Sequence, residues 1–164
     1  MFCKGDYVKY GAQGIFQISE IRSMRFGPGQ PAESYYVLQP VAKEKAEVFV
    51  PVSNDRLTQK MQPVPTAEEI DDMIQRIRGQ SMPWNPDRRE RAADYQQILA
   101  RHSEPELLLL IHTLYLRSLH SPKGLPSGDA QVFKQAKSLI DEEFSFSLHL
   151  PTEQIRDYIQ TRLS

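Results

Sequence analysis

The pattern of apolar residues changes once along this 164-residue chain, at Met61-Gln62-Pro63-Val64-Pro65, and this change most constrains the fold. Before it, short runs rich in β-branched and aromatic residues end at glycine or proline, which is typical of strands. After it, apolar residues recur every three or four positions, as on one face of a helix. The sequence therefore predicts an α+β chain with a small β domain over residues 1–60 and a helical domain over residues 66–164.

Four runs in the first 60 residues predict strands. They cover residues 6–10, 15–21, 34–39 and 47–50, and a dense turn signal at 26–31 separates the second from the third. The runs are short and closely spaced, and no helical period lies among them. This arrangement indicates a small twisted sheet or an SH3-like barrel.

Five helices are predicted after residue 65. Each of four predicted helix starts carries a side chain that can accept a hydrogen bond from a free amide; these residues are Thr66, Asn85, Ser103 and Thr152. A glutamate three residues later completes a capping box in two cases, with Glu69 and with Glu106. The third helix, from Ser103 through Leu119, is apolar nearly all round, so we expect it to be the buried centre of this half. The fourth helix follows a loop at residues 121–126.

Composition excludes several classes of protein. The longest strictly apolar run, Leu107 to Ile111, is far short of the roughly 20 residues that a membrane span requires. The charged N-terminus does not resemble a signal peptide, and the single cysteine cannot form an internal disulfide. A cytoplasmic protein is expected. The net charge of −1 argues against general coating of nucleic acid, although a local basic patch remains compatible with it.

No catalytic or metal-binding constellation is found. The spacing of the four histidines matches no metal-ligand motif, and Cys3 has no neighbouring base in the sequence. The acidic pair Glu142-Glu143 is expected on a solvated helix face. We therefore expect no catalytic residue, no metal and no cofactor.

The single tryptophan lies in the most informative segment. Trp84 stands between two prolines, just before a predicted helix, so its backbone is held at a corner. Residues 76–101 contain six arginines and three acidic residues. Arg88 and Arg91 share a helix face, with Arg89 to one side of it. Such an aromatic residue can wedge into the minor groove of DNA beside arginines that bind phosphates, or it can simply fill the gap between two helices.

Six segments, in order, resemble the CarD/CdnL family of bacterial transcription regulators. They are the opening 2–10, the glycine-led second strand at 14–18, the third strand at 35–38, the Val-Pro-Val-Ser-Asn strand end within 48–54, Pro83-Trp84 with the basic run 88–91, and the late helix within 125–144. The resemblance spans essentially the whole chain, and the order and spacing of the segments are more specific than any one of them.

The resemblance implies a Tudor-like domain over residues 1–60 that binds the β subunit of RNA polymerase, with Arg25 and Phe49 as our candidates for the contact. It also implies that the helical domain contacts promoter DNA from the minor groove side, at the upstream edge of the transcription bubble. There Trp84 would act as the wedge, and Arg88, Arg89 and Arg91 would bind phosphates, which would stabilise the open complex.

On this interpretation the protein is a monomer that associates with the nucleoid through polymerase, is not an enzyme and has no contact with a membrane. Two alternatives remain open. In the first, the protein is a polymerase- or protein-binding adaptor whose helical domain binds protein and not DNA. In the second, an SH3- or Tudor-like ligand-binding domain is joined to a helical enzyme or regulatory module.

Overall fold

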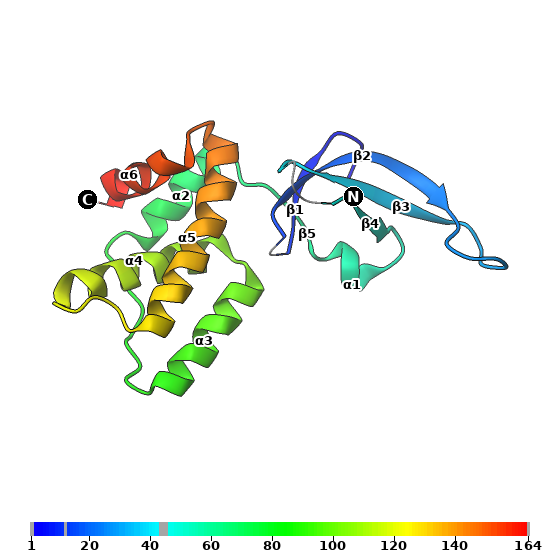
Figure 1. Cartoon of the computed structure of the whole chain (residues 1–164). Helices are drawn as coiled ribbons and strands as arrows, with labels where there is room; N and C mark the ends of the chain where they lie inside the picture. The colour runs from blue at the N-terminus through cyan, green and yellow to red at the C-terminus, as the bar shows by residue number, and fades with distance from the viewer. Residues whose placement is uncertain (1, 12, 43–45, 164) are drawn as a thin grey trace. The chain divides into compact units, whose positions relative to one another are not determined.

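The computed structural model describes residues 2–11, 13–42 and 46–163. The chain divides into two compact units, Met1–Val64 and Pro65–Ser164 (Figure 1). A five-stranded antiparallel sheet forms the first unit, and five helices form the second. The predicted α+β class is therefore confirmed.

The sheet of the N-terminal unit has the order β4-β3-β2-β1-β5. Its strands are β1 Tyr7–Tyr10, β2 Ile15–Met24, β3 Glu33–Pro40, β4 Val48–Pro51 and β5 Met61–Pro63. β2 and β3 form a long hairpin with an irregularity between Ile18 and Glu20, and β4 and β5 lie at the two edges. One face carries the core, to which Phe16, Ile18 and Leu38 contribute the largest fully buried side chains.

Two elements of this unit are absent from the sequence prediction. Residues 61–65 were expected to interrupt the chain, but Met61–Pro63 pairs with β1 and Met61 is buried in the core. Pro63 has no amide hydrogen to donate, and an edge strand tolerates this. The other element is the short helix α1, Asp55–Thr58, where Asn54 Oδ1 accepts a hydrogen bond from the Leu57 amide at 3.2 Å. The sheet thus continues past residue 60.

The helical unit consists of α2 Ala67–Ile77, α3 Arg88–Arg101, α4 Glu104–His120, α5 Ser127–Leu148 and α6 Thr152–Leu163 (Figure 1). All five contribute to one hydrophobic core. α4 supplies Leu107, Leu108, Leu110 and Leu114 to it, as expected of a central helix. Its last turn differs, because Leu119 is exposed to solvent. No helix in the described ranges is long and apolar enough to cross a membrane.

The capping box at the start of α2 is confirmed. Thr66 Oγ1 accepts from the Glu69 amide at 3.2 Å, and the Glu69 carboxylate accepts from the Thr66 amide at 3.3 Å. The capping box predicted for α4 does not form, since Ser103 makes no side-chain cap bond. The Glu106 carboxylate instead accepts two hydrogen bonds from Arg101, at 2.7 and 3.0 Å, because the stronger charged donor lies within its reach.

Two other predicted caps also differ. Asp87, not Asn85, caps α3: its Oδ1 accepts from the amides of Arg89 and Glu90 at 3.0 and 3.1 Å. The Asn85 side chain forms a turn of its own by accepting from the Asp87 amide at 3.0 Å. Thr152 is predicted to cap the last helix from the position just before it. In the structure Thr152 is itself the first residue of α6.

The expectation of a solvated Glu142-Glu143 pair is wrong for Glu143. This residue is only 3% exposed, and its Oε2 lies 3.4 Å from Nε2 of His102. His102 ends α3 in a left-handed conformation, with φ of 50°. The helical repeat of α5 therefore turns Glu143 inward, toward His102 at the end of α3.

Candidate functional site

The segment that carries Trp84 connects α2 to α3 and is held at both ends. The Met82 amide donates to Thr113 Oγ1 of α4 at 2.9 Å. On the other side, Asp87 caps α3 and is itself bonded by Asn85. Trp84 is half-buried and packs against the core of the helical unit. The segment is thus a fixed corner, as the two prolines predict, and the indole is neither fully exposed nor fully buried.

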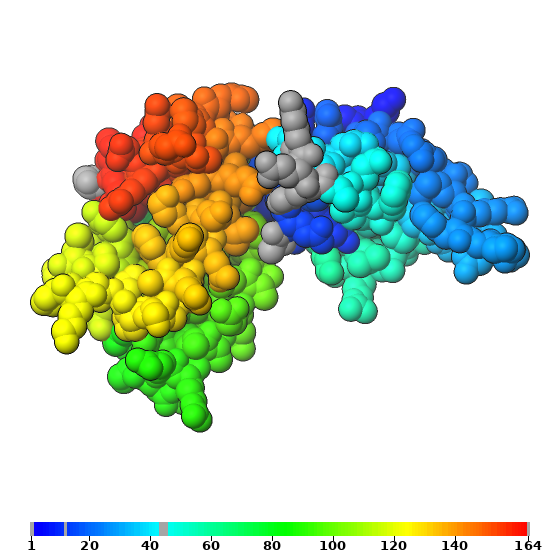
Figure 2. All heavy atoms as spheres, viewed as in Figure 1, coloured from blue at the N-terminus to red at the C-terminus, as the bar shows by residue number. Residues whose placement is uncertain are grey.

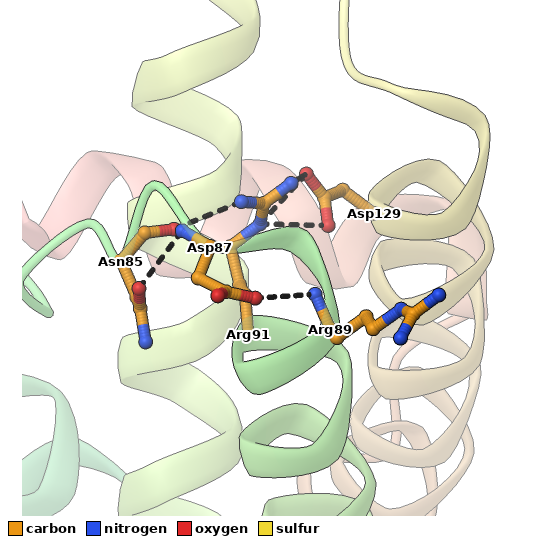
Figure 3. Close-up of polar contacts among 5 residues, drawn as sticks. All are labelled: Asn85, Asp87, Arg89, Arg91 and Asp129. Carbon is orange, nitrogen blue, oxygen red and sulfur yellow. Dashed lines mark hydrogen bonds and ion pairs between the residues drawn. The ribbon is translucent and has the colours of Figure 1, made fainter.

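Arg91 lies inside the helical unit. It is 5% exposed, and so is Asp129 in the first turn of α5. Its Nε and Nη2 donate to the Asp129 carboxylate at 3.2 and 3.0 Å, while its Nη1 donates to the Asn85 carbonyl at 2.8 Å (Figure 3). One guanidinium therefore joins α3, the corner segment and α5.

Two guanidinium groups lie against the indole of Trp84. The central carbon of Arg91 is 4.1 Å from the ring centroid, and that of Arg117 on α4 is 3.6 Å from it. A guanidinium is a planar group nearly as wide as the ring, so two of them fit this close to one centroid only on opposite faces. We infer from the two distances that the guanidinium groups cover opposite faces of the half-buried ring and leave its edge toward solvent. Such contacts attract electrostatically because the ring face carries partial negative charge.

The arginines predicted to bind DNA therefore separate into two groups. Arg88 and Arg89 are exposed on the first turn of α3, whereas the guanidinium of Arg91 is engaged by Asp129 and Asn85. Arg88 and Arg91 line the same side of α3, as the helical spacing predicts, but Arg91 is buried there by its partner Asp129, which is 38 residues away in sequence. Arg117 is not among the predicted site residues, because its helix is apolar nearly all round and is expected at the buried centre of this half.

Arg88 lines a groove of about 350 Å³ between α3 and the start of α5. The groove is also lined by the ion pair of Arg91 and Asp129 and by uncharged polar side chains, namely Gln96 from α3 and Ser127, Gln131 and Gln135 from α5. Figure 2 shows α3 in green and the start of α5 in yellow on one face of the helical unit. The charges of Arg91 and Asp129 are paired with each other, so the exposed guanidinium of Arg88 is the group at this groove that can donate to anionic oxygens of a ligand.

The charges around Arg91 also act on Tyr95, which is buried one turn further along α3. Burial raises the pKa of its hydroxyl, and the Asp129 carboxylate raises this pKa further, whereas Arg91 and Arg117 oppose the shift. On α4, burial lowers the pKa of His112. Both side chains are therefore uncharged at neutral pH. No group of three or more His, Cys, Asp or Glu residues in the described ranges could hold a metal ion.

The N-terminal unit carries an exposed aromatic patch, formed by Phe26, Tyr35 and Phe49. The ring of Phe26 lies 5.1 Å from that of Tyr35 and 6.2 Å from that of Phe49, both edge to face. Phe26 is 63% exposed and Phe49 39%. Side chains alternate along strands, and Tyr36 pairs with the buried Val50, so Tyr35 and Phe49 lie on the face opposite the core.

The two residues chosen from the sequence for a partner contact lie near each other in this unit. Phe49 is on the edge strand β4 within the aromatic patch, and Arg25 is exposed next to Phe26. Exposed aromatic side chains beside an arginine and an edge strand are typical of protein-binding surfaces.

Residues 2–65 match the family model of the CarD-like/TRCF RID domain. The N-terminal unit belongs to this family. The RID domain is a protein-interaction domain for the β subunit of RNA polymerase. The match therefore confirms the family resemblance predicted from the sequence and supports polymerase binding by this unit. The match ends at the junction of the two units, and the helical unit lies outside it. No curated protein matches the chain.

Proposed function

We propose that this protein is a non-enzymatic transcription regulator that binds the β subunit through its RID domain and stabilises the promoter open complex through its helical unit. The single observation that carries the proposal is the fixed corner at Trp84, on a chain whose other half is a polymerase-interacting domain. Such a chain brings a rigid aromatic edge and two exposed arginines to transcribed DNA.

The aromatic patch and strand β4 are the proposed polymerase contact. β4 is an edge strand, so the backbone groups on its outer side can pair with a strand of a partner protein. Phe26 and Phe49 provide apolar anchors beside that edge, and Arg25 provides a charge. Aromatic residues and arginine are enriched among the side chains that dominate binding energy.

Trp84, Arg88 and Arg89 are the proposed DNA contact. Proteins that deform DNA from the minor groove insert an apolar side chain between base steps while cations bind the flanking phosphates. Trp84 presents its edge for such insertion, and Arg88 and Arg89 are exposed on the next helix. Arg91 is buried and its charge is paired with Asp129, so we assign the phosphate contacts to Arg88 and Arg89.

The test is the lifetime of the open complex formed with Trp84→Ala. An unstacked base step costs a few kcal/mol, and a wedge recovers part of that. Loss of about 1.4 kcal/mol shortens the lifetime roughly tenfold, which a fluorescent bubble reporter resolves. Phe133→Ala is a matched control, because Phe133 is another half-buried aromatic residue packed on the same core. Phe133→Ala should lower the melting temperature and leave the open-complex lifetime unchanged. Equal open-complex lifetimes for the wild type and Trp84→Ala would refute the wedge.

A second candidate function is that of an adaptor whose helical unit binds protein. Residues 66–164 contain 12 basic and 15 acidic side chains, a balance that repels DNA at long range. A tryptophan between arginines also suits a protein interface. In this case Trp84→Ala weakens the complex with a protein partner and leaves bubble closure unchanged in a reconstituted assay containing only polymerase, sigma factor and promoter.

A further inference from the structure

The arginine stack on Trp84 has one fixed side and one exposed side. Arg91 is buried and bonded to Asp129 and to the Asn85 carbonyl, so its position follows from the fold. Arg117 is exposed, and its guanidinium lies closer to the ring, at 3.6 Å. It stands one helical turn after Thr113, whose hydroxyl accepts from the Met82 amide. The same face of α4 therefore meets the corner segment twice, at its backbone and at its indole.

We propose that Arg117 is a positioning residue for Trp84: together with Arg91 it holds the indole edge-outward in the free protein, before any DNA is bound. The inference rests on the proposed function of Trp84 and deepens it by naming what fixes the wedge. An unsupported half-buried indole can turn about two side-chain torsions. Two planar cations against its faces restrict those torsions, so the ordering is complete in the free protein and is not required again on binding.

The arrangement also explains why Arg117 and not a neutral residue occupies this position. The partial negative charge on an indole face attracts a cation, and a planar guanidinium stacks on it with more contact than an ammonium group. Leucine at position 117 would cover the ring by burial alone. The positive charge of Arg117 also lies directly beside the indole edge that, on the proposed function, enters the minor groove, where it attracts the DNA phosphates.

The experiment uses the full chain and its intrinsic fluorescence. Trp84 is the only tryptophan, so emission reports on this indole alone. Arg117→Gln removes the cation and retains polar size. We expect the population of indole displaced from the stack to rise about two- to five-fold, the factor that corresponds to one exposed cation–π contact. Acrylamide quenching should increase and fluorescence anisotropy should fall. Arg117→Lys, which keeps the charge without the planar group, should give intermediate values.

Arg156→Gln is the matched control. Arg156 is exposed on α6 and lies over the ring of Tyr115 at 4.9 Å, so the same charge and the same kind of contact are lost at another ring. Quenching and anisotropy of Trp84 should remain at wild-type values in this variant. Equal quenching and anisotropy in Arg117→Gln and wild type would overturn the proposal, and so would equal changes in the two glutamine variants.

The promoter assay then separates this inference from the proposed function. If Trp84 is the wedge, Arg117→Gln shortens the open-complex lifetime in the same direction as Trp84→Ala and by no more than that variant does. A mobile indole in Arg117→Gln with an unchanged bubble lifetime, while Trp84→Ala shortens it, would overturn the positioning role. A lifetime that is unchanged even in Trp84→Ala refutes the wedge alone, since the quenching and anisotropy results decide the stack without DNA.

Discussion

Replacing Asp129 by asparagine tests the internal role of Arg91. Asparagine keeps the size of the side chain and removes its charge, so the buried guanidinium of Arg91 loses its counter-ion. Removing one partner of a buried ion pair costs about 3–5 kcal/mol, chiefly because the remaining charge is uncompensated. In a unit of about 100 residues, each kcal/mol lowers the melting temperature by about 4–8 °C. We therefore expect the helical unit of Asp129→Asn to melt at least about 12 °C below the wild type.

Urea denaturation of the full chain, followed by tryptophan emission, reports on the unfolding of the helical unit, because Trp84 lies beside the Arg91–Asp129 pair. Asp157→Asn removes an exposed carboxylate from α6 and serves as the control; surface substitutions of this kind usually change stability by less than about 0.5 kcal/mol. The double variant Arg91→Met/Asp129→Leu removes both charges at similar volume. It should recover most of the lost stability, because apolar pairs often replace buried ion pairs without loss.

A cost below about 1 kcal/mol for Asp129→Asn would refute this reasoning. It would mean that water reaches the Arg91 guanidinium in solution, and Arg91 would then return to the set of phosphate-binding candidates. A double variant as unstable as the sum of the two single variants would also contradict it, since the two side chains would then show no coupling.

Three further predictions concern binding and pH. Phe49→Ala should weaken polymerase binding by roughly 30-fold or more, because the loss of one interface anchor costs about 2 kcal/mol. A pull-down in which binding is unchanged would exclude the aromatic patch as the polymerase contact. Free-protein binding to DNA should be weak and fall with salt with a log–log slope of about −1.8, for phosphate contacts by Arg88 and Arg89, and a salt-independent affinity would contradict those contacts. Burial lowers the pKa of His112 in the folded protein, so as pH falls below about 6.5 the imidazole is protonated in the unfolded chain before it is protonated in the folded one. The stability of the fold should therefore decrease below this pH. Melting curves of His112→Gln should lack this part of the acid dependence.

Local signals in the sequence were sufficient for most of the elements. The four predicted strands and the five predicted helices all occur, and the Thr66–Glu69 capping box forms as expected. The α1 helix could also have been predicted, because Asn54 is a favourable cap residue followed by Asp55 in the first turn. Strand β5 could not, since a three-residue run that ends in a proline becomes a strand only when β1 offers its edge.

The candidate site shows the same division between local and distant causes. The corner at Trp84 follows from neighbouring prolines and could be predicted. Helical spacing placed Arg91 on an outer face, but its carboxylate partner and Arg117, the second cation of the stack, come from other helices. A single sequence contains no signal for either contact. The same holds for Glu143, whose burial depends on the position of His102 at the end of α3.

Only Val64, Pro65 and Thr66 separate β5 from α2, so the chain from Pro63 to Ala67 spans at most about 14 Å. When the RID domain is bound to polymerase, such a connection keeps the helical unit at an effective local concentration in the millimolar range or above, wherever its geometry allows contact with the promoter. An intrinsically weak contact with DNA is then sufficient for occupancy, and it dissociates quickly enough for the polymerase to leave. On the proposed function, the short junction restricts the contact with promoter DNA to places where a polymerase is already present.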